Sequence, residues 1–194
     1  MSTPLAAVLD LDTHCMLRVR EGDEACLGLL VERHRNSLVG FFYRMVQNHA
    51  VAEELAQETF LRVFNSRRRY EPSARFTTWL YRIATNLALN WLRDHRAESR
   101  CDPMEGSDGS GLVQLADQRP GIDRRLVRHV EISEVRRAIA SLPERQRTCV
   151  ILHKYEGFSY AQIAEAMNTS EQAIRSLAFR AYEVLRQRLA HLAP

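Results

Sequence analysis

The stretch SYAQIAEAMNTSEQAIRSLAFR, residues 159–180, contains two helix starts separated by a short turn. Ser159, followed three residues later by Gln162, forms a capping box and begins a helix over residues 160–166. Asn168 occupies the turn position where a positive φ is most needed, which Asn tolerates better than most residues. Two helices joined in this way form a helix-turn-helix, whose second helix enters the major groove of duplex DNA.

The second helix of this motif is capped by Thr169 or Ser170 and runs from about residue 171 to residue 190. Its inner stripe is apolar, and its outward face consists of Glu171, Gln172, Arg175, Ser176, Phe179 and Arg180. Arginine reads guanine edges or holds phosphates, glutamine reads adenine, and phenylalanine touches the thymine methyl group. The outward face is therefore a candidate DNA surface. The alternative is that its arginines only solvate a small helical bundle.

Two more helices are expected before the motif, over residues 131–141 and 144–154. Pro143 is tolerated at the start of the second of these, and Gly157 suits the turn after its end. Together the four helices form a domain over residues 131–192.

Helical periodicity is lost across residues 98–130, where Gly, Pro, Ser and Asp accumulate. A loop this long is unusual inside one compact domain, so we interpret the segment as a flexible linker between two domains. The preceding domain, residues 12–97, shows three amphipathic helix patterns, after Asp23, after Asn48 and from about Thr78 to Arg96. No segment alternates apolar and polar residues. The sequence therefore predicts an all-α fold of two small helical domains joined by a flexible linker.

Charge is distributed unevenly along the first domain. Residues 20–61 contain four Arg against seven acidic residues, a net charge of −3, whereas residues 62–100 contain nine Arg against three acidic residues, a net charge of +6. Two faces of opposite sign suggest two different partners. The alternative is an uneven surface that is simply solvated.

The helix after Asn48 leaves a mostly acidic face outside its apolar stripe, made of Glu53, Glu54, Gln57, Glu58, Leu61 and Arg62. An exposed Leu among carboxylates is a plausible docking surface for a basic partner. Taken alone, such a face is also typical of an ordinary acidic helix.

The segment RFTTWLYRIATN, residues 75–86, interleaves aromatic residues with Arg and hydroxyl residues, and it follows the triple arginine of residues 67–69. Basic residues hold phosphates, while aromatic rings stack on unpaired bases at about 1–3 kcal/mol per base. Phe76 can instead belong to the core. For Trp79 a core role and a DNA role are both open, and the two are compatible.

Several function classes are disfavoured. No apolar run approaches the length of a membrane span and no export signal is visible, so a cytoplasmic protein without membrane insertion is expected. The four cysteines, Cys15, Cys26, Cys101 and Cys149, have no paired spacing and read as free thiols. Cys149 and His153 lie four residues apart on a helix, but two ligands do not make a metal site. We expect no cofactor, no metal and no catalytic activity, because no nucleophile motif or phosphate-binding loop is present.

Several separated motifs resemble a known family. Residues 52–60 (AEELAQETF) and 76–86 (FTTWLYRIATN) resemble region two of extracytoplasmic-function sigma factors, and residues 142–144 and 155–164 (YEGFSYAQIA) resemble region four. The resemblance covers about residues 12–97 and 131–190. It implies a bacterial transcription initiation factor whose partners are core RNA polymerase, promoter DNA and an anti-sigma factor.

The resemblance also implies residue roles. The face that grips the coiled coil of the polymerase clamp matches Glu54, Gln57, Glu58 and Leu61. Asn86 and Asn90 match positions that read the minus-ten element. The loop of residues 66–75 matches the one that receives a flipped base. Arg175, Phe179 and Arg180 match positions that contact the minus-thirty-five element. The full set of DNA-binding candidates is Arg69, Tyr70, Arg75, Phe76, Trp79, Asn86, Asn90, Arg93, Gln172, Arg175, Ser176, Phe179 and Arg180. The chain departs from the family pattern at Leu177, where many relatives are basic, and at Gln172 and Ala173, where they carry Gly-Thr.

One other function class uses the same motif. A stand-alone helix-turn-helix regulator would bind duplex DNA as a dimer. It would leave the acidic face and the aromatic segment of the first domain without a role.

Overall fold

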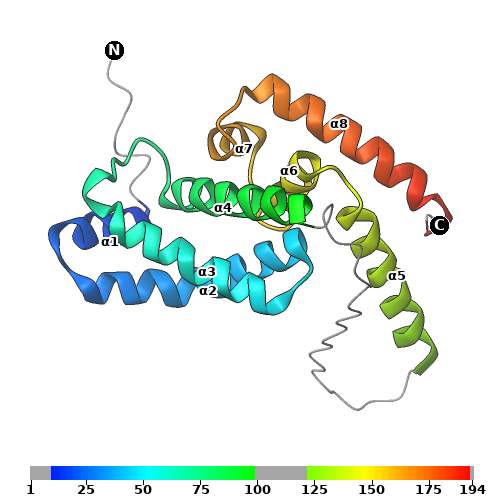
Figure 1. Cartoon of the computed structure of the whole chain (residues 1–194), viewed down its shortest axis with the longest axis horizontal. Coiled ribbons are helices and arrows are strands. Elements are labelled where there is room, and N and C mark those ends of the chain that lie inside the picture. The colour runs from blue at the N-terminus through cyan, green and yellow to red at the C-terminus, as the bar shows by residue number, and fades with distance from the viewer. Residues whose placement is uncertain (1–9, 99–121, 193–194) are drawn as a thin grey trace.

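The computed structural model describes residues 10–98 and 122–192, and every regular element in these ranges is a helix (Figure 1). Most of the segment interpreted as a linker lies outside the described residues. Helix α5 (Ile122–Ala140) begins inside that segment, earlier than the expected start at residue 131. The all-α prediction is confirmed for the described part of the chain.

The first half consists of α1 (Leu11–Glu21), α2 (Glu24–Val46), α3 (His49–Asn65), the short 3-10 helix η2 (Arg67–Arg69) and α4 (Phe76–Glu98). The expected starts of α2 and α3 are confirmed, because the side chains of Asp23 and Asn48 accept hydrogen bonds from backbone N–H groups of the first turns. Helix α1 was not predicted. It is capped by Asp10 and ends at Gly22, whose φ of 106° places it in the left-handed region.

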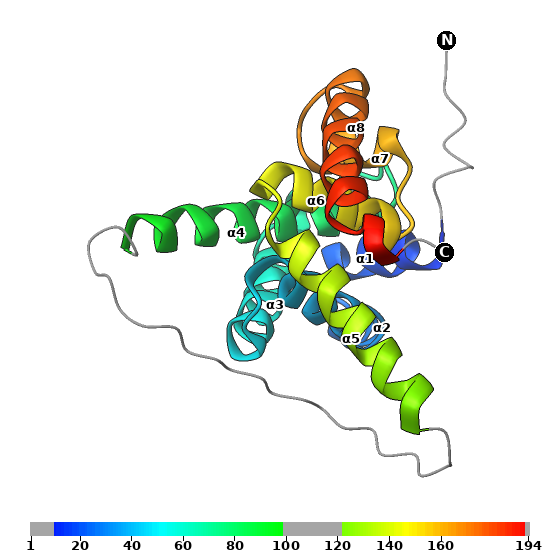
Figure 2. The ribbon, with the colours of Figure 1, turned by 90° about the vertical axis from the view of Figure 1, so that its right-hand side faces the viewer.

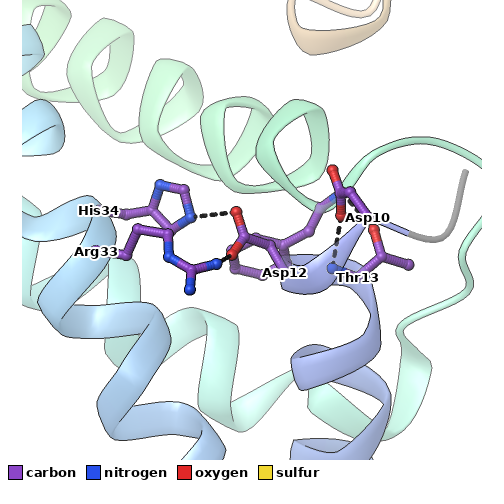
Figure 3. A network of polar contacts seen from close by, with 6 residues as sticks. Asp10, Asp12, Thr13, Arg33 and His34 are labelled. Atoms are coloured by element: carbon purple, nitrogen blue, oxygen red, sulfur yellow. Dashed lines mark hydrogen bonds and ion pairs between the residues drawn. The ribbon is translucent and has the colours of Figure 1, made fainter.

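A polar network holds α1 against its neighbours (Figure 3). The Asp12 carboxylate pairs with Arg33 and lies 2.9 Å from Nε2 of the buried His34, both on α2. The hydroxyl of Thr13 accepts a hydrogen bond at 3.2 Å from the backbone N–H of Phe76, the first residue of α4. Helix α1 therefore fixes the start of the helix that carries the aromatic segment.

The second half consists of α5, α6 (Glu144–Lys154), α7 (Tyr160–Ala166), α8 (Glu171–Arg188) and the 3-10 helix η3 (Ala190–Leu192). The capping box of Ser159 and Gln162 is formed in both directions. Asn168 has a φ of 47°, as expected for the turn. The helix-turn-helix predicted from residues 159–180 is therefore confirmed.

The two halves pack on each other. Helix α4 lies between α2 and α3 on one side and α6 and α7 on the other; Figure 1 shows it at the centre of the molecule, and in Figure 2 it extends to the left. Helix α2 also contacts α5 and α6. Buried apolar residues from both halves form one hydrophobic cluster.

Candidate functional site

The outer face of α8 is open to solvent. Ser170 caps this helix by accepting a hydrogen bond from the backbone N–H of Ala173 at 3.2 Å, and the inner residues Ile174 and Ala178 are buried. The candidates for contacting DNA are all exposed: Gln172, Arg175, Ser176, Phe179 and Arg180. Phe179 is 68% exposed, which nothing in the packing of this chain requires. Arg175 pairs with Glu171 at 2.6 Å, an exposed pair that preorients the guanidinium.

Two residues expected to contact DNA are instead buried in the core. Tyr70 is 1% exposed and Phe76 is fully buried, so neither presents a ring to an unpaired base. The centres of the Tyr70 and Phe76 rings are 6.3 Å apart, and the Tyr70 ring packs edge to face on Trp79 with 4.9 Å between the ring centres. The loop after α3 needs an apolar anchor, and these aromatic residues supply it. Tyr70 and Phe76 are therefore corrected from DNA contacts to supports of the loop.

Trp79 is half-buried and serves both the core and a surface pocket. Its ring contacts Tyr70 and Phe76, and it also lines a cavity of about 230 Å³ beside the loop of residues 66–75. The cavity is lined by Arg69, Glu71, Ser73, Ala74, Thr78, Trp79, Arg82 and Glu165. Arg82 and Glu165 were not among the sequence candidates. Arg82 could have been found from the sequence as a cavity candidate, because it follows Trp79 by three residues on the same helix. Glu165 could not, because it comes from α7 and no local signal places it at this cavity. Arg75 is exposed on the same loop.

A second hollow lies between the end of α3 and the outer face of α4. It measures about 630 Å³ and is lined by Arg62, Asn65, Ser66, Arg68, Arg69, Ile83 and Asn86. No carboxylate lines it, so it is suited to an anion such as a phosphate backbone. Asn90 and Arg93 are exposed further along α4, at helical spacing from Asn86.

The outer sides of α2 and α3 enclose an apolar groove of about 820 Å³ with charged edges. Its lining includes Leu27, Val31, Phe60, Leu61 and Phe64, together with Gln57, Glu24, Glu32 and Arg35. Leu61 is 57% exposed. Sequence reasoning found the α3 side of this groove and missed the α2 side.

The two acidic candidates on α3 differ in their partners. Glu58 pairs with Arg62 at 2.7 Å, whereas Glu54 is exposed and makes no ion pair with any described residue. On α2, Leu29 is 51% exposed, although the helical pattern placed it on the inner stripe. An unpaired carboxylate on the same helix face as the exposed Leu61 is consistent with a partner surface.

Cys149 and His153 both have structural roles, since Cys149 is buried in the core and His153 contacts a backbone carbonyl. Burial raises the pKa of the Cys149 thiol to about 11, and Nδ1 of His153 lies 2.9 Å from the carbonyl oxygen of Phe158. Among residues 10–98 and 122–192, no group of three or more His, Cys, Asp or Glu side chains is placed to hold a metal ion. Cys15, Cys26 and Cys149 are free thiols, and Cys101 lies outside the described residues. No helix in the described part of the chain is long and apolar enough to span a membrane.

Comparison with known proteins matches both halves of the chain. Residues 30–98 match Sigma-70 region 2, and residues 132–185 match Sigma-70, region 4. The RNA polymerase sigma factor CarQ of Myxococcus xanthus is 37% identical over 91% of this chain and 97% of its own length. The ECF RNA polymerase sigma factor SigW of Bacillus subtilis is 28% identical over 90% of this chain and 95% of its own length.

Solved structures share the fold. CnrH, solved with the cytosolic domain of CnrY, has a TM-score of 0.69 at 20% identity and covers 95% of this chain and 100% of its own. The sigma factor RpoE of Bartonella quintana, solved with the anti-sigma factor NepR, has a TM-score of 0.66 at 21% identity and covers 84% of this chain and 96% of its own. The matches of both halves and of the relatives lead to one conclusion: the chain belongs to the sigma-70 family as a sigma factor of the extracytoplasmic-function type, which directs RNA polymerase to specific promoters and initiates transcription.

Proposed function

We propose that this sigma factor uses three separate surfaces for its three tasks. The α2–α3 groove binds core RNA polymerase, the α4 face with its neighbouring loop opens the minus-ten element, and the outer face of α8 docks on the minus-thirty-five element. The observation that carries the proposal is the contrast between two surfaces of one helical bundle. One is an apolar groove with Glu24, Glu32 and Arg35 at its edges, and the other is a hollow lined by Arg62, Arg68, Arg69 and Asn86 without a carboxylate.

At the polymerase surface, the apolar centre contributes most of the affinity, and the charged edge fixes the orientation of the bound partner. Leu61 and Phe64 offer apolar area that solvent would otherwise cover, and Glu54 and Glu58, on the same helix, offer charge to a basic partner. Gln57 lies within the groove itself.

At the minus-ten surface, contacts between the protein and an extruded base compensate for the stacking that the base loses when it leaves the duplex. Extruding a base costs a few kcal/mol, and a pocket with an aromatic wall offsets that cost. The cavity beside Trp79 has such a wall, with Arg69 and Arg82 positioned for the neighbouring phosphates. Asn86 and Asn90 have amide groups that can read base edges along the opened strand.

The proposal extends to organisation and partners. Residues 12–97 and 131–192 act as the two binding domains, and the segment between them raises the effective concentration of each domain for its own element. The protein captures DNA and performs no catalysis. It works in the cytoplasm, with RNA polymerase. An anti-sigma factor is a further proposed partner, since RpoE of Bartonella quintana was solved with one.

Charge reversal on α3 tests the polymerase surface. The double variant Glu54→Arg with Glu58→Arg should abolish co-purification with core polymerase and run-off transcription while circular dichroism stays unchanged. The matched control is Glu131→Arg with Glu183→Arg, two reversals on α5 and α8 instead of α3, which should bind normally. Binding by the α3 variant equal to the control would refute the assignment.

A further inference from the structure

Helix α1 contacts both ends of the loop that precedes α4. The guanidinium of Arg20 donates a hydrogen bond at 3.3 Å to the carbonyl oxygen of Tyr70, where the chain leaves η2. The hydroxyl of Thr13 accepts a hydrogen bond at 3.2 Å from the backbone N–H of Phe76, where the chain enters α4. Two side chains of one helix thus hold the two ends of residues 71–75.

The loop has little backbone structure of its own. Among the described residues, the stretch 71–74 makes one backbone hydrogen bond within itself, from the Ser73 N–H to the Glu71 carbonyl at 2.8 Å. The Phe76 N–H belongs to the first turn of α4, where backbone donors have no partner inside the helix. Thr13 is fully buried and supplies the acceptor that this donor needs. The conformation of the loop therefore depends on contacts from outside it, and α1 supplies one at each end.

Helix α1 is itself fixed against α2. The Asp12 carboxylate pairs with Arg33 and lies 2.9 Å from Nε2 of His34 (Figure 3). Met16 and Val19, on the inner side of α1, are buried. The two loop contacts therefore come from a helix whose own position is held by packing and by an ion pair.

The loop forms one wall of the cavity beside Trp79. Glu71, Ser73 and Ala74 line this cavity from the loop, opposite residues of α4 that include Trp79. A movement of the loop ends therefore displaces one wall of the cavity relative to the other. A binding site discriminates well only when the residues behind it hold its walls in place. Neither of the two α1 side chains lines the cavity, so both act on it through the loop.

We propose that Thr13 and Arg20 are positioning residues that shape the pocket for the extruded base of the minus-ten element. The inference rests on the proposed role of the cavity beside Trp79. The match to Sigma-70 region 2 begins at residue 30, after the end of α1, so it assigns this helix no part in promoter opening. The role proposed for α1 needs no contact with DNA, because its two side chains hold backbone atoms of the loop.

Two kinds of variant separate this role from general support of the fold. Thr13→Val keeps the shape of the side chain but leaves the buried Phe76 N–H without its acceptor, whereas Thr13→Ser keeps the hydroxyl. Arg20→Ala removes an exposed side chain, so it should leave the fold intact and free only the other end of the loop. Arg18→Ala is its matched control, because Arg18 lies on the same helix and pairs with Asp23 instead of the loop.

An abasic site, placed at one position of the minus-ten element at a time, measures what each base contributes to binding. Single-stranded DNA that carries this element needs no melting, so its affinity for the holoenzyme reports the contacts alone. For the wild type, the abasic site should lower the affinity roughly tenfold or more at the extruded base, because a stacked base is lost there. Thr13→Val and Arg20→Ala should each reduce this loss by roughly fivefold, the effect of one hydrogen bond, without changing the losses at other positions or the affinity for core polymerase. Thr13→Ser and Arg18→Ala should behave as the wild type.

Each result decides the role of α1. An unchanged loss at the extruded base in either variant would overturn the role of that residue, and an equal change at every position, or in Arg18→Ala, would show general support of the fold instead. If Thr13→Val fails to fold, Arg20→Ala decides alone, because its side chain is exposed. A wild type without any sensitive position would overturn the proposed pocket and this inference with it.

Hydrogen exchange of the full chain tests the contacts without DNA. The amides of residues 71–76 should exchange faster in Thr13→Val and Arg20→Ala than in the wild type, while those of α3 should be unchanged. Equal exchange in the loop of all variants would overturn the claim that α1 holds it, whatever the proposed pocket does.

Discussion

Removing two arginines from the outer face of α8 should weaken promoter docking in a salt-dependent way. Arg175 and Arg180 are both exposed, and the only ion pair of Arg175 among the described residues is with Glu171, on the same helix. An exposed pair of this kind contributes about 0.3–0.5 kcal/mol, so Arg175→Ala with Arg180→Ala should leave the fold intact. Each lost phosphate contact lowers the salt slope of binding by about 0.9, hence by about 1.8 for two contacts.

The consequence is measurable by titrating the holoenzyme on promoter DNA at two salt concentrations. Between about 50 and about 200 mM salt, a slope lower by about 1.8 makes the double variant lose roughly twelvefold less affinity than the wild type. The control is Arg186→Ala with Arg188→Ala, which removes two exposed arginines from the last turn of α8. The defect of the first variant should fade on a template melted in advance. Equal failure on that template, or an equal slope change in the control, would refute the docking role of Arg175 and Arg180.

Two further predictions concern Asn86 on α4 and Glu156, which follows α6. Asn86→Ala should impair strand opening, which a fluorescent base in the minus-ten element reports. A premelted template should relieve the defect only in part, because in the proposed role the amide also reads the single strand. Unchanged opening would contradict the assignment. Burial raises the pKa of the Glu156 carboxyl, more than the Tyr81 hydroxyl and Arg44 lower it. A pKa raised in the folded chain means that the contribution of Glu156 to stability is complete below the ordinary carboxyl pKa and is lost as pH rises through the raised value. The midpoint of thermal unfolding, followed by circular dichroism from pH 4 to pH 8, should therefore fall with rising pH by more in the wild type than in Glu156→Gln, and an equal fall in both would contradict the prediction.

Local signals predicted much of the fold. Ser159 with Gln162 fixed the start of α7, Asn168 fixed the turn, and both work through hydrogen bonds and φ preferences that span only a few residues. Helix α1 was missed although Asp10 and Gly22 cap it, because its apolar residues do not form a clear stripe. The candidates on α8 could be placed because one helix fixes all of their directions.

Long-range packing could not be predicted in the same way. Tyr70 and Phe76 were expected to face DNA, because an aromatic residue among arginines looks the same in sequence whether its ring is buried or exposed. Leu29 fits the helical stripe but faces outward, since no other element covers that part of α2. The Tyr81–Glu156 contact joins residues 75 positions apart and leaves no periodic trace.

The departures on α8 change what this helix can read. Leu177, basic in many relatives, is half-buried and packs against the core, so here it stabilises the helix rather than touching DNA. Gln172 is exposed one turn before Ser176 and two turns before Phe179, so in the proposed role amide, hydroxyl and aromatic groups contact bases and two arginines hold phosphates. A surface with so few charges binds duplex DNA weakly by itself. Docking by α8 should then depend on polymerase to hold both halves on the promoter.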